Sequence, residues 1–266
     1  MASEAIEQNA SKHTHFAHCF TRGRACVARL AGPIVCLLGT IVALFLGACA
    51  GVSTSQGVRN TSRTFTTVVL DAGHGAHDSG TRTRRGVLEK DLALDVTLRV
   101  VPKLREAGFR TVLTRKRDVF IPLDNRVSIS DQQQNAIFVS IHFNDAGRKP
   151  VAGVESYYFS PESKTMAERI LRSLSAATGA ENRGARVARF RVLRTNHNPA
   201  VLMECGYLTS LRESALITQA AYRERIAEGV ARGIIQQRGG PLRGANSENV
   251  SENGAERVFS LSAPQW

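Results

Sequence analysis

The stretch TTVVLDAGHG, residues 66–75, joins a run of strand-forming residues to a turn in which a histidine stands between two glycines. Residues 66–70 are β-branched or apolar, as in strands that are buried in a sheet. Gly73 and Gly75 allow the backbone beside His74 to turn sharply and to approach a ligand closely. The stretch therefore predicts a buried strand that presents a functional side chain at its carboxyl end.

Short apolar runs alternate with amphipathic segments along the rest of the chain. We expect strands at 66–70, 109–113, 136–141, 154–159 and 200–203, and helices at 89–107, 166–177 and 220–235. The first of these helices ends before Gly108, a residue type that often stops helices. Alternation of this kind predicts an α/β domain with a largely parallel sheet.

Two histidines and two glutamates occupy places that one crevice can share. His74 and His142 follow the first and third expected strands, and Glu204 follows the fifth. Glu89 stands at the start of the first helix, and the carboxyl ends of strands in an open α/β sheet face a common crevice. Zinc hydrolases use three such ligands and a nearby carboxylate. From spacing alone, hydrogen-bonded loop histidines, a favourable charge in the first turn of a helix and a loop carboxylate remain alternatives.

Several short motifs occur in a fixed order between residues 66 and 237. They are Asp71-Ala72-Gly73-His74-Gly75, Glu89-Lys90, Thr114-Arg115, Asp118, Arg126, Ser140-Ile141-His142 and the stretch PAVLMECGY at 199–207. In this order they resemble the zinc-dependent N-acetylmuramoyl-L-alanine amidase family, amidase type 3. The chain departs from the family pattern at Phe143, Tyr207 and Thr209-Ser210, and none of these departures removes an expected ligand.

The resemblance implies that His74, Glu89 and His142 bind one zinc ion per chain and that Glu204 is the catalytic carboxylate. It implies a single catalytic domain with a mixed, mostly parallel six-stranded sheet flanked by helices. It also implies hydrolysis of the amide between N-acetylmuramic acid and L-alanine in peptidoglycan, for cell-wall remodelling or daughter-cell separation. The alternatives are a zinc carboxypeptidase of the stem peptide and a lipoprotein that binds peptidoglycan without cutting it.

Other polar residues are expected to serve the fold. We expect that His77, His197 and Glu155 are not ligands, and that Cys205 is a small packed thiol. Three residues of the motifs are expected to form a structural ion pair rather than a substrate contact: Arg115, Asp118 and Arg126. Five arginines are expected to lie on a solvated face that is able to hold carboxylates of the wall: Arg183, Arg186, Arg189, Arg191 and Arg194.

The N-terminal segment indicates export. Arg22, Arg24 and Arg29 precede an uncharged run at 30–46, and the Leu46-Gly47-Ala48-Cys49 that ends it resembles the signal of bacterial lipoproteins. We expect a signal peptide at 1–48, a flexible tether at 49–65 with lipidated Cys49, a zinc amidase domain at 66–238 and a disordered tail at 239–266. An uncleaved signal anchor is the alternative. The protein would be lipid-anchored in the cell envelope, at the periplasmic face of the outer membrane.

The net charge and the lengths of the loops limit which partners and which control elements are expected. The net charge of +12 favours acidic polymers, but export and an aromatic content of 6% disfavour nucleic acid. We expect a monomer that acts on peptidoglycan, reaches the membrane through its lipid, and has no disulfide because Cys205 stands alone in the exported domain. Residues 160–165, between the fourth strand and the next helix, are too few for the self-inhibitory insertion of some family members.

Overall fold

The computed structural model of the protein describes residues 57–147 and 151–240. The expected signal peptide at 1–48 and Cys49 lie outside the described residues. The same holds for residues 50–56 of the expected tether and 241–266 of the expected tail. Within the described ranges, no helix combines the length and the apolar character that crossing a membrane requires.

A six-stranded sheet runs through the centre of the domain in the order β2-β1-β3-β6-β4-β5. Its strands are β1 (Thr67–Ala72), β2 (Arg110–Leu113), β3 (Ala136–Asn144), β4 (Val154–Tyr158), β5 (Asn182–Val187) and β6 (Ala200–Tyr207). The four strands from β2 to β6 in this order are parallel, whereas β4 is antiparallel to β6 and parallel to β5. The predicted mixed, mostly parallel sheet is confirmed.

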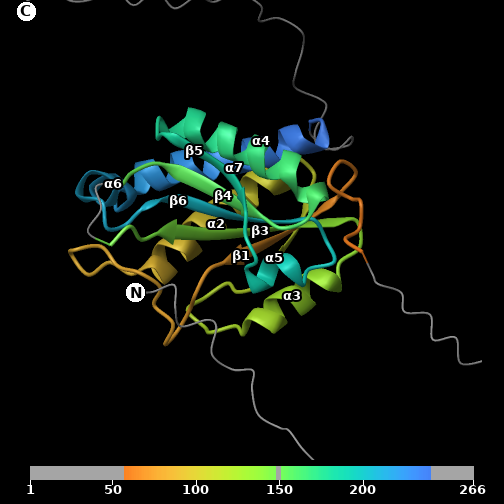
Figure 1. The fold of residues 1–266 in the computed structure, drawn as a ribbon, viewed down its shortest axis with the longest axis horizontal. Helices are drawn as coiled ribbons and strands as arrows, with labels where there is room; N and C mark the ends of the chain where they lie inside the picture. The colour runs from red at the N-terminus through yellow and green to blue at the C-terminus, as the bar shows by residue number, and fades with distance from the viewer. Residues whose placement is uncertain (1–56, 148–150, 241–266) are drawn as a thin grey trace, which may run out of the picture. The chain divides into compact units, whose positions relative to one another are not determined.

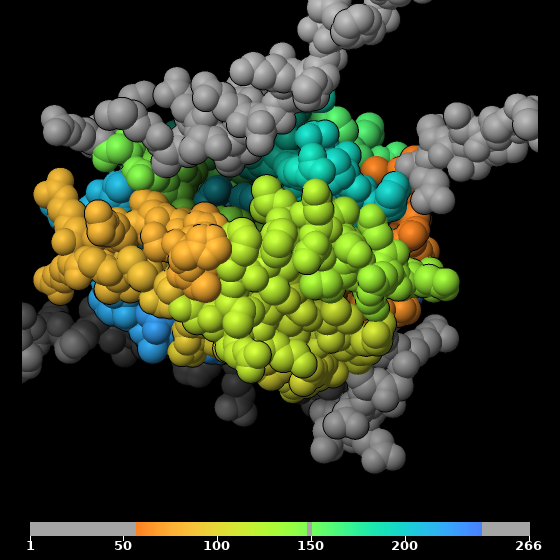
Figure 2. Space-filling model, turned by 90° about the horizontal axis from the view of Figure 1, so that it is seen from below, coloured from red at the N-terminus to blue at the C-terminus, as the bar shows by residue number. Residues whose placement is uncertain are grey.

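Helices cover both faces of the sheet. They are α2 (Glu89–Glu106), α3 (Leu123–Asp131), α4 (Pro161–Thr178), α5 (Arg191–Arg194), α6 (Leu211–Ile217) and α7 (Ala220–Arg238). Figure 1 shows α4 and α7 above the sheet and α3 and α5 below it. Seen from below, α3 covers much of the face, and the segment that follows β1, coloured orange to gold, forms one edge of it (Figure 2).

Apolar side chains of the strands alternate between two cores. On β1, Val68 and Leu70 belong to the large core with α2, α4 and α7, whereas Val69 belongs to the small core with α3 and α5. This alternation follows from the pleat, which points successive side chains to opposite faces. Because both faces are buried, the central strands read as nearly continuous apolar runs, which explains why the sequence located them.

Two glycines allow α7 to lie close against α4. A Cβ at Gly229 would stand 2.7 Å from Leu174 Cα, and one at Gly233 would stand 2.6 Å from Ile170 Cα. Separations this short are not tolerated by any larger residue at either position. The spacing of four residues places both glycines on one side of α7, so that side forms the contact surface of the helix pair.

The structure corrects several predicted boundaries. β3 and β6 extend beyond the predicted strands, so His142 and Glu204 lie inside strands rather than in the loops after them. The sequence does not predict the edge strand β5, whose arginines give no apolar alternation, or the short helices α3, α5 and α6. α4 begins at Pro161, so only Phe159 and Ser160 separate it from β4, and no insertion is present at this link.

Candidate metal centre

The three residues predicted to bind metal meet at the carboxyl edge of the sheet. His74 lies in the turn after β1, Glu89 is the first residue of α2, and His142 lies near the end of β3. One ligand atom from each lies within 4.8 Å of the others. Glu89 Oε1 is 3.0 Å from His74 Nε2 and 3.0 Å from His142 Nδ1. The fold thus brings together side chains that are far apart in the sequence, since 68 positions separate His74 from His142.

Glycine is required beside this cluster. A Cβ at Gly73 would overlap the ring of His142, and a Cβ at Gly80 would overlap Glu89 and His74. Gly80 also has a φ of +63°, a conformation that side chains with a Cβ rarely adopt. Two nitrogen donors and one carboxylate, packed this closely, form a donor set that zinc takes in hydrolases. The residues present therefore fit a zinc ion.

Further contacts fix the orientation of the cluster. Asp78 Oδ1 lies 2.8 Å from His74 Nδ1, so the ring keeps Nε2 directed at Glu89. Glu89 accepts hydrogen bonds from the backbone N–H groups of Thr81 (2.9 Å) and Phe143 (3.0 Å). Asp78 was not among the predicted site residues, although a carboxylate four residues after a candidate ligand is a signal for such an orienting group.

The ionised carboxylate of Glu89 favours positive charge at the cluster. Burial opposes ionisation of Glu89, but hydrogen bonds from His142 and His74 outweigh it and hold the pKa of Glu89 well below its usual range. Burial also opposes a charge on His74, yet Glu89 and Asp78 raise the pKa of that imidazole above its ordinary value. The cluster thus holds an ionised carboxylate whose charge stabilises positive charge at the histidines, as it would on a metal.

A buried ion pair supports the turn that carries His74. Asp71, 1% exposed, accepts hydrogen bonds from Arg126 Nη1 at 2.7 Å, Thr114 Oγ1 at 2.6 Å and Ser140 Oγ at 2.7 Å. Burial raises the pKa of Asp71, but Arg126 and the two hydroxyl groups outweigh this and lower it below its ordinary value. This carboxylate is therefore fully partnered and ionised.

The two motif arginines hold the backbone of the same turn. Arg126 Nη2 donates to the carbonyl of His74 at 2.7 Å, where the backbone has a φ of 61° that is unusual outside glycine. Arg115 Nη2 donates to the carbonyl of Gly73 at 2.7 Å. Both arginines thus make structural contacts, but the pairing differs from the prediction: Arg126 pairs with Asp71, whereas Asp118 pairs with Lys90 at 2.6 Å.

Glu204 lies beside this cluster with an unpartnered oxygen. Its backbone is in register with His142 of β3 on one side and with Glu155 of β4 on the other. The Oε2 atom is buried, and no described residue forms a hydrogen bond with it. Burial, followed by the charges of Glu89 and Glu155, raises the pKa of Glu204 well above its ordinary value. A buried polar atom without a partner is rare and points to a ligand that completes the site.

Glu155 lies opposite Glu204 and, unlike Glu204 Oε2, has hydrogen-bond partners among the described residues. It is 2% exposed and accepts hydrogen bonds from Tyr157 Oη at 2.6 Å, Tyr207 Oη at 3.0 Å and Arg183 Nε at 3.0 Å. Burial raises its pKa, but these donors outweigh burial and lower it. Glu155 is thus not part of the metal cluster, as expected, but its position opposite Glu204 was not predicted.

Some of the remaining predictions agree with the structure and others do not. His77 packs on Phe120, with ring centroids 4.3 Å apart, and His197 lies 2.8 Å from Asp131, so neither joins the metal cluster. Cys205 is buried and free, as expected, and burial raises the pKa of its thiol. Four of the five arginines are exposed, as expected, and Arg183 is half-buried; Arg183 and Arg186 also approach the buried Glu155, and Arg191 pairs with Asp124.

Residues 68–236 match the family model described as N-acetylmuramoyl-L-alanine amidase. The chain is similar to the N-acetylmuramoyl-L-alanine amidase LytC of Bacillus subtilis, with 35% identity over 173 residues, or 64% of this chain and 35% of that protein. The amidase AmiA of Escherichia coli is 28% identical over 215 residues, or 63% of this chain and 74% of AmiA. The chain thus spans only about a third of the length of LytC.

Solved structures agree with the sequence comparisons. The amidase AmiC2 of Nostoc punctiforme has a TM-score of 0.62 and 38% identity, over 68% of this chain and 98% of that one. The catalytic domain of the amidase CwlV from Bacillus (Paenibacillus) polymyxa also has a TM-score of 0.62 and 38% identity, over 65% of this chain and 97% of that one. The family model covers well over half of the sequence, and the chain therefore belongs to the N-acetylmuramoyl-L-alanine amidase family.

Proposed function

We propose that this protein is a zinc-dependent hydrolase of the amide between N-acetylmuramic acid and L-alanine in peptidoglycan. One observation carries the proposal: the His74–Glu89–His142 cluster lies beside the unpartnered Oε2 of Glu204. Membership of the amidase family supports the choice of bond and substrate. In the cell, such an activity would serve wall remodelling or the separation of daughter cells.

His74, Glu89 and His142 would hold one zinc ion per chain. A zinc ion held there supplies Lewis acidity, which polarises a carbonyl group and makes water more acidic. Asp78 would keep the ring of His74 in place, and the backbone donors to Glu89 would keep its carboxylate in place. The protein thereby presents a site that is formed before substrate arrives.

Glu204 would move the proton during hydrolysis. Its Oε2 accepts a proton from the water that attacks the carbonyl carbon of the scissile amide. The C–N bond then breaks, and Glu204 passes the same proton to the departing nitrogen of L-alanine. A raised pKa suits the group that carries the proton between these steps, and a cation at the cluster would favour the ionised form before each cycle.

The organisation outside the domain is part of the proposal. Residues 1–48 would direct export, Cys49 would carry lipid, and residues 49–65 would tether the domain at 66–238, followed by a disordered tail at 239–266. The enzyme would then act from the periplasmic face of the outer membrane as a monomer. Radiolabelled palmitate incorporated by the wild-type protein and not by Cys49→Ala would test the anchor.

Product analysis tests the proposed bond. Purified peptidoglycan is digested with the full chain in the presence of zinc, and the fragments are identified by mass spectrometry. The proposal predicts intact stem peptides with a free L-alanine amino group, together with glycan that has lost its peptides. Stems shortened at their carboxyl ends would identify a carboxypeptidase instead, and pelleting with peptidoglycan without any product would identify a protein that only binds.

A further inference from the structure

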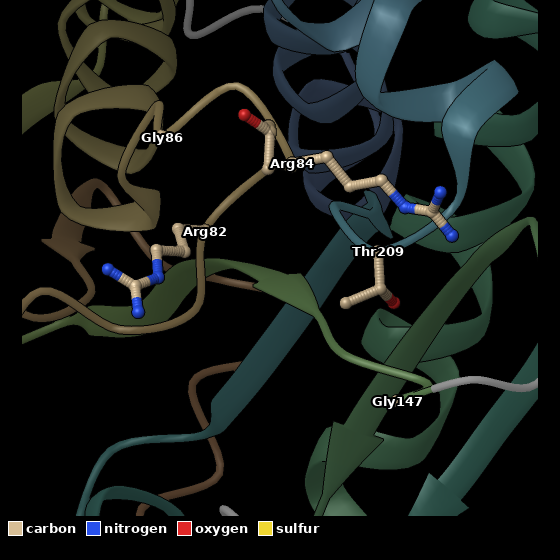
Figure 3. A pocket seen from close by; sticks show the side chains of 6 residues that line it. Arg82, Arg84, Gly86, Gly147 and Thr209 are labelled. Atoms are coloured by element: carbon tan, nitrogen blue, oxygen red, sulfur yellow. The ribbon is translucent and has the colours of Figure 1, made fainter.

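A pocket opens between the three loops that follow β1, β3 and β6 at the carboxyl edge of the sheet. Its volume is about 680 Å³, and it is lined by Arg82, Thr83, Arg84, Gly86, Gly147 and Thr209. Figure 3 shows Arg82 and Arg84 leaving the loop in different directions, with Arg84 on the side of Thr209. The lining presents two guanidinium groups and hydroxyl groups, so the pocket is suited to an anion.

The arginines of this loop are not paired with acids. Other arginines of the domain are, including Arg126 with Asp71 and Arg223 with Asp95. Among the described residues, no carboxylate lies within ion-pair distance of Arg82, Arg84 or their neighbour Arg85. Their donors remain available to a ligand.

The walls of the pocket are held in place before any ligand binds. Thr83 is buried, its N–H donates to the carbonyl of Val87 at 2.9 Å, and its Oγ1 accepts from Val87 N–H at 3.1 Å. These bonds close a tight turn that carries the arginines. On the opposite wall, Thr209 Oγ1 accepts from the N–H of Ala146 at 3.0 Å, which leaves the hydroxyl proton free to be donated.

The pocket begins one residue from the proposed reaction centre. The N–H of Thr81 donates to Glu89 Oε2 at 2.9 Å, and Arg82 is the next residue. On the other wall, Thr209 follows β6, the strand that carries Glu204. A peptide spans at most about 3.6 Å per residue, so groups on the second and third residues of a stem lie about 7 to 11 Å from the amide at its start. The pocket is therefore within reach of the early residues of a stem whose first amide is held at the reaction centre.

We propose that Arg82, Arg84 and Thr209 form a subsite for carboxylates of the peptide stem, so that the enzyme selects stems that are acidic near the scissile amide. This inference rests on the proposed function, because it takes the stem peptide as the ligand. Two guanidinium groups that point in different directions suit a ligand with more than one carboxylate. Thr209, one of the positions where the chain departs from the family pattern, supplies the remaining donor.

Paired substrates test the subsite with the full chain. The probes are N-acetylmuramoyl-L-alanyl-D-glutamate and its diamide, in which both carboxylates are converted to uncharged carboxamides. We expect the wild type to show a KM about tenfold lower for the acid than for the diamide, the size of one charge-assisted contact. The double variant Arg82→Gln/Arg84→Gln should lose this preference through a rise in its KM for the acid.

Arg85→Gln is the matched control, since Arg85 is exposed, lies in the same loop and does not line the pocket. It should keep the preference for the acid. Equal KM values of the wild type for acid and diamide would overturn the subsite, as would an equal loss in Arg85→Gln, which would show that only the overall charge matters. Inhibition by a glycerol phosphate polymer that the double variant relieves, without a preference for carboxylates, would assign the pocket to phosphate and also overturn it.

A binding measurement separates the failure of the subsite from the failure of the proposed function. If the wild type cleaves neither probe, the proposed reaction is wrong. Calorimetry with L-alanyl-D-glutamate then tests whether the pocket binds carboxylates. Binding that is lost in the double variant and kept in Arg85→Gln would support the subsite. No binding to the wild type would contradict it.

Discussion

Asp71 and Glu204 are two acidic residues at the same edge of the sheet, and their surroundings are opposite. Asp71 at the end of β1 accepts hydrogen bonds from an arginine and two hydroxyl groups. Glu204 in β6 leaves Oε2 buried without a partner among the described residues. Burial alone raises the pKa of both groups, but only Asp71 has donors that reverse the effect.

The difference distinguishes a carboxylate with a structural role from a carboxyl group with a catalytic one. A buried carboxylate with every partner in place stabilises one geometry, here the turn that carries His74. A buried carboxyl group without a partner costs stability in the isolated domain, and sites of this kind are retained where a ligand or a reaction completes them. The contrast predicts that Asp71 matters mainly for stability and Glu204 mainly for turnover.

Asp71→Asn should produce the largest loss of stability. The substitution leaves the guanidinium of Arg126, which is 3% exposed, without its counter-charge. Breaking a buried pair in this way costs about 3 to 5 kcal/mol in the free energy of unfolding. Urea unfolding followed by circular dichroism measures it, and a loss below about 1 kcal/mol would show that Asp71 does not hold the turn.

Zinc should stabilise the domain by a smaller amount. A ligand that binds only the native state adds about 2.7 kcal/mol when its free concentration is 100 times its Kd. Thermal unfolding with zinc and with a chelator should show this gain in the wild type and in His77→Ala, whose ring packs outside the cluster. His142→Ala should lose it, and an undiminished gain in that variant would contradict the ligand assignment.

The contribution of Asp71 should depend on pH. The native pKa of Asp71 lies below its ordinary value of 3.8 because Arg126, Thr114 and Ser140 outweigh burial. The unfolded chain therefore binds the proton first as the pH falls, and the stabilisation is present above about pH 3.8 and is lost below it. The difference in unfolding free energy between the wild type and Asp71→Asn should shrink from pH 6 to pH 3. A constant difference would show that the charge is not responsible.

Glu228→Gln should produce the smallest effect. Glu228 pairs with Arg232 one turn later on α7, and both side chains are about half exposed. Exposed pairs of this spacing contribute about 0.3 to 0.5 kcal/mol. Urea unfolding should detect little change, and a loss comparable to that of Asp71→Asn would undermine the argument that burial sets the difference.

The sequence predicted the central strands and long helices because their signals are local. Strands β1, β3 and β6 are buried on both faces, and α2 and α7 present an apolar side to the core, so each is visible as a pattern. β5 was missed because an edge strand rich in arginine lacks alternation. The packing of Gly229 and Gly233 against α4 was missed because it depends on a partner distant in sequence.

The sequence predicted the parts of the candidate site that consist of motif residues. It did not predict the parts that depend on contacts between distant segments. His74, Glu89 and His142 were named from the sequence, and the structure brings them together. The donors to Asp71, and the donors Arg183 and Tyr207 to Glu155, come from other strands, helices and loops, so no spacing rule links them. The pocket of Arg82 and Thr209 likewise joins loops 127 positions apart in the numbering.

Glu204→Gln tests the central claim most directly, because it keeps the shape of the side chain and removes only its ability to carry a proton. Turnover of a soluble muropeptide, zinc content and the free energy of unfolding are measured on the same preparation of the full chain. The proposed role of Glu204 predicts that turnover falls by about a hundredfold or more. Zinc content should stay at the wild-type level, and stability should not decrease, since Oε2 has no partner to lose. Near-normal turnover, or a loss of stability like that of Asp71→Asn, would contradict it.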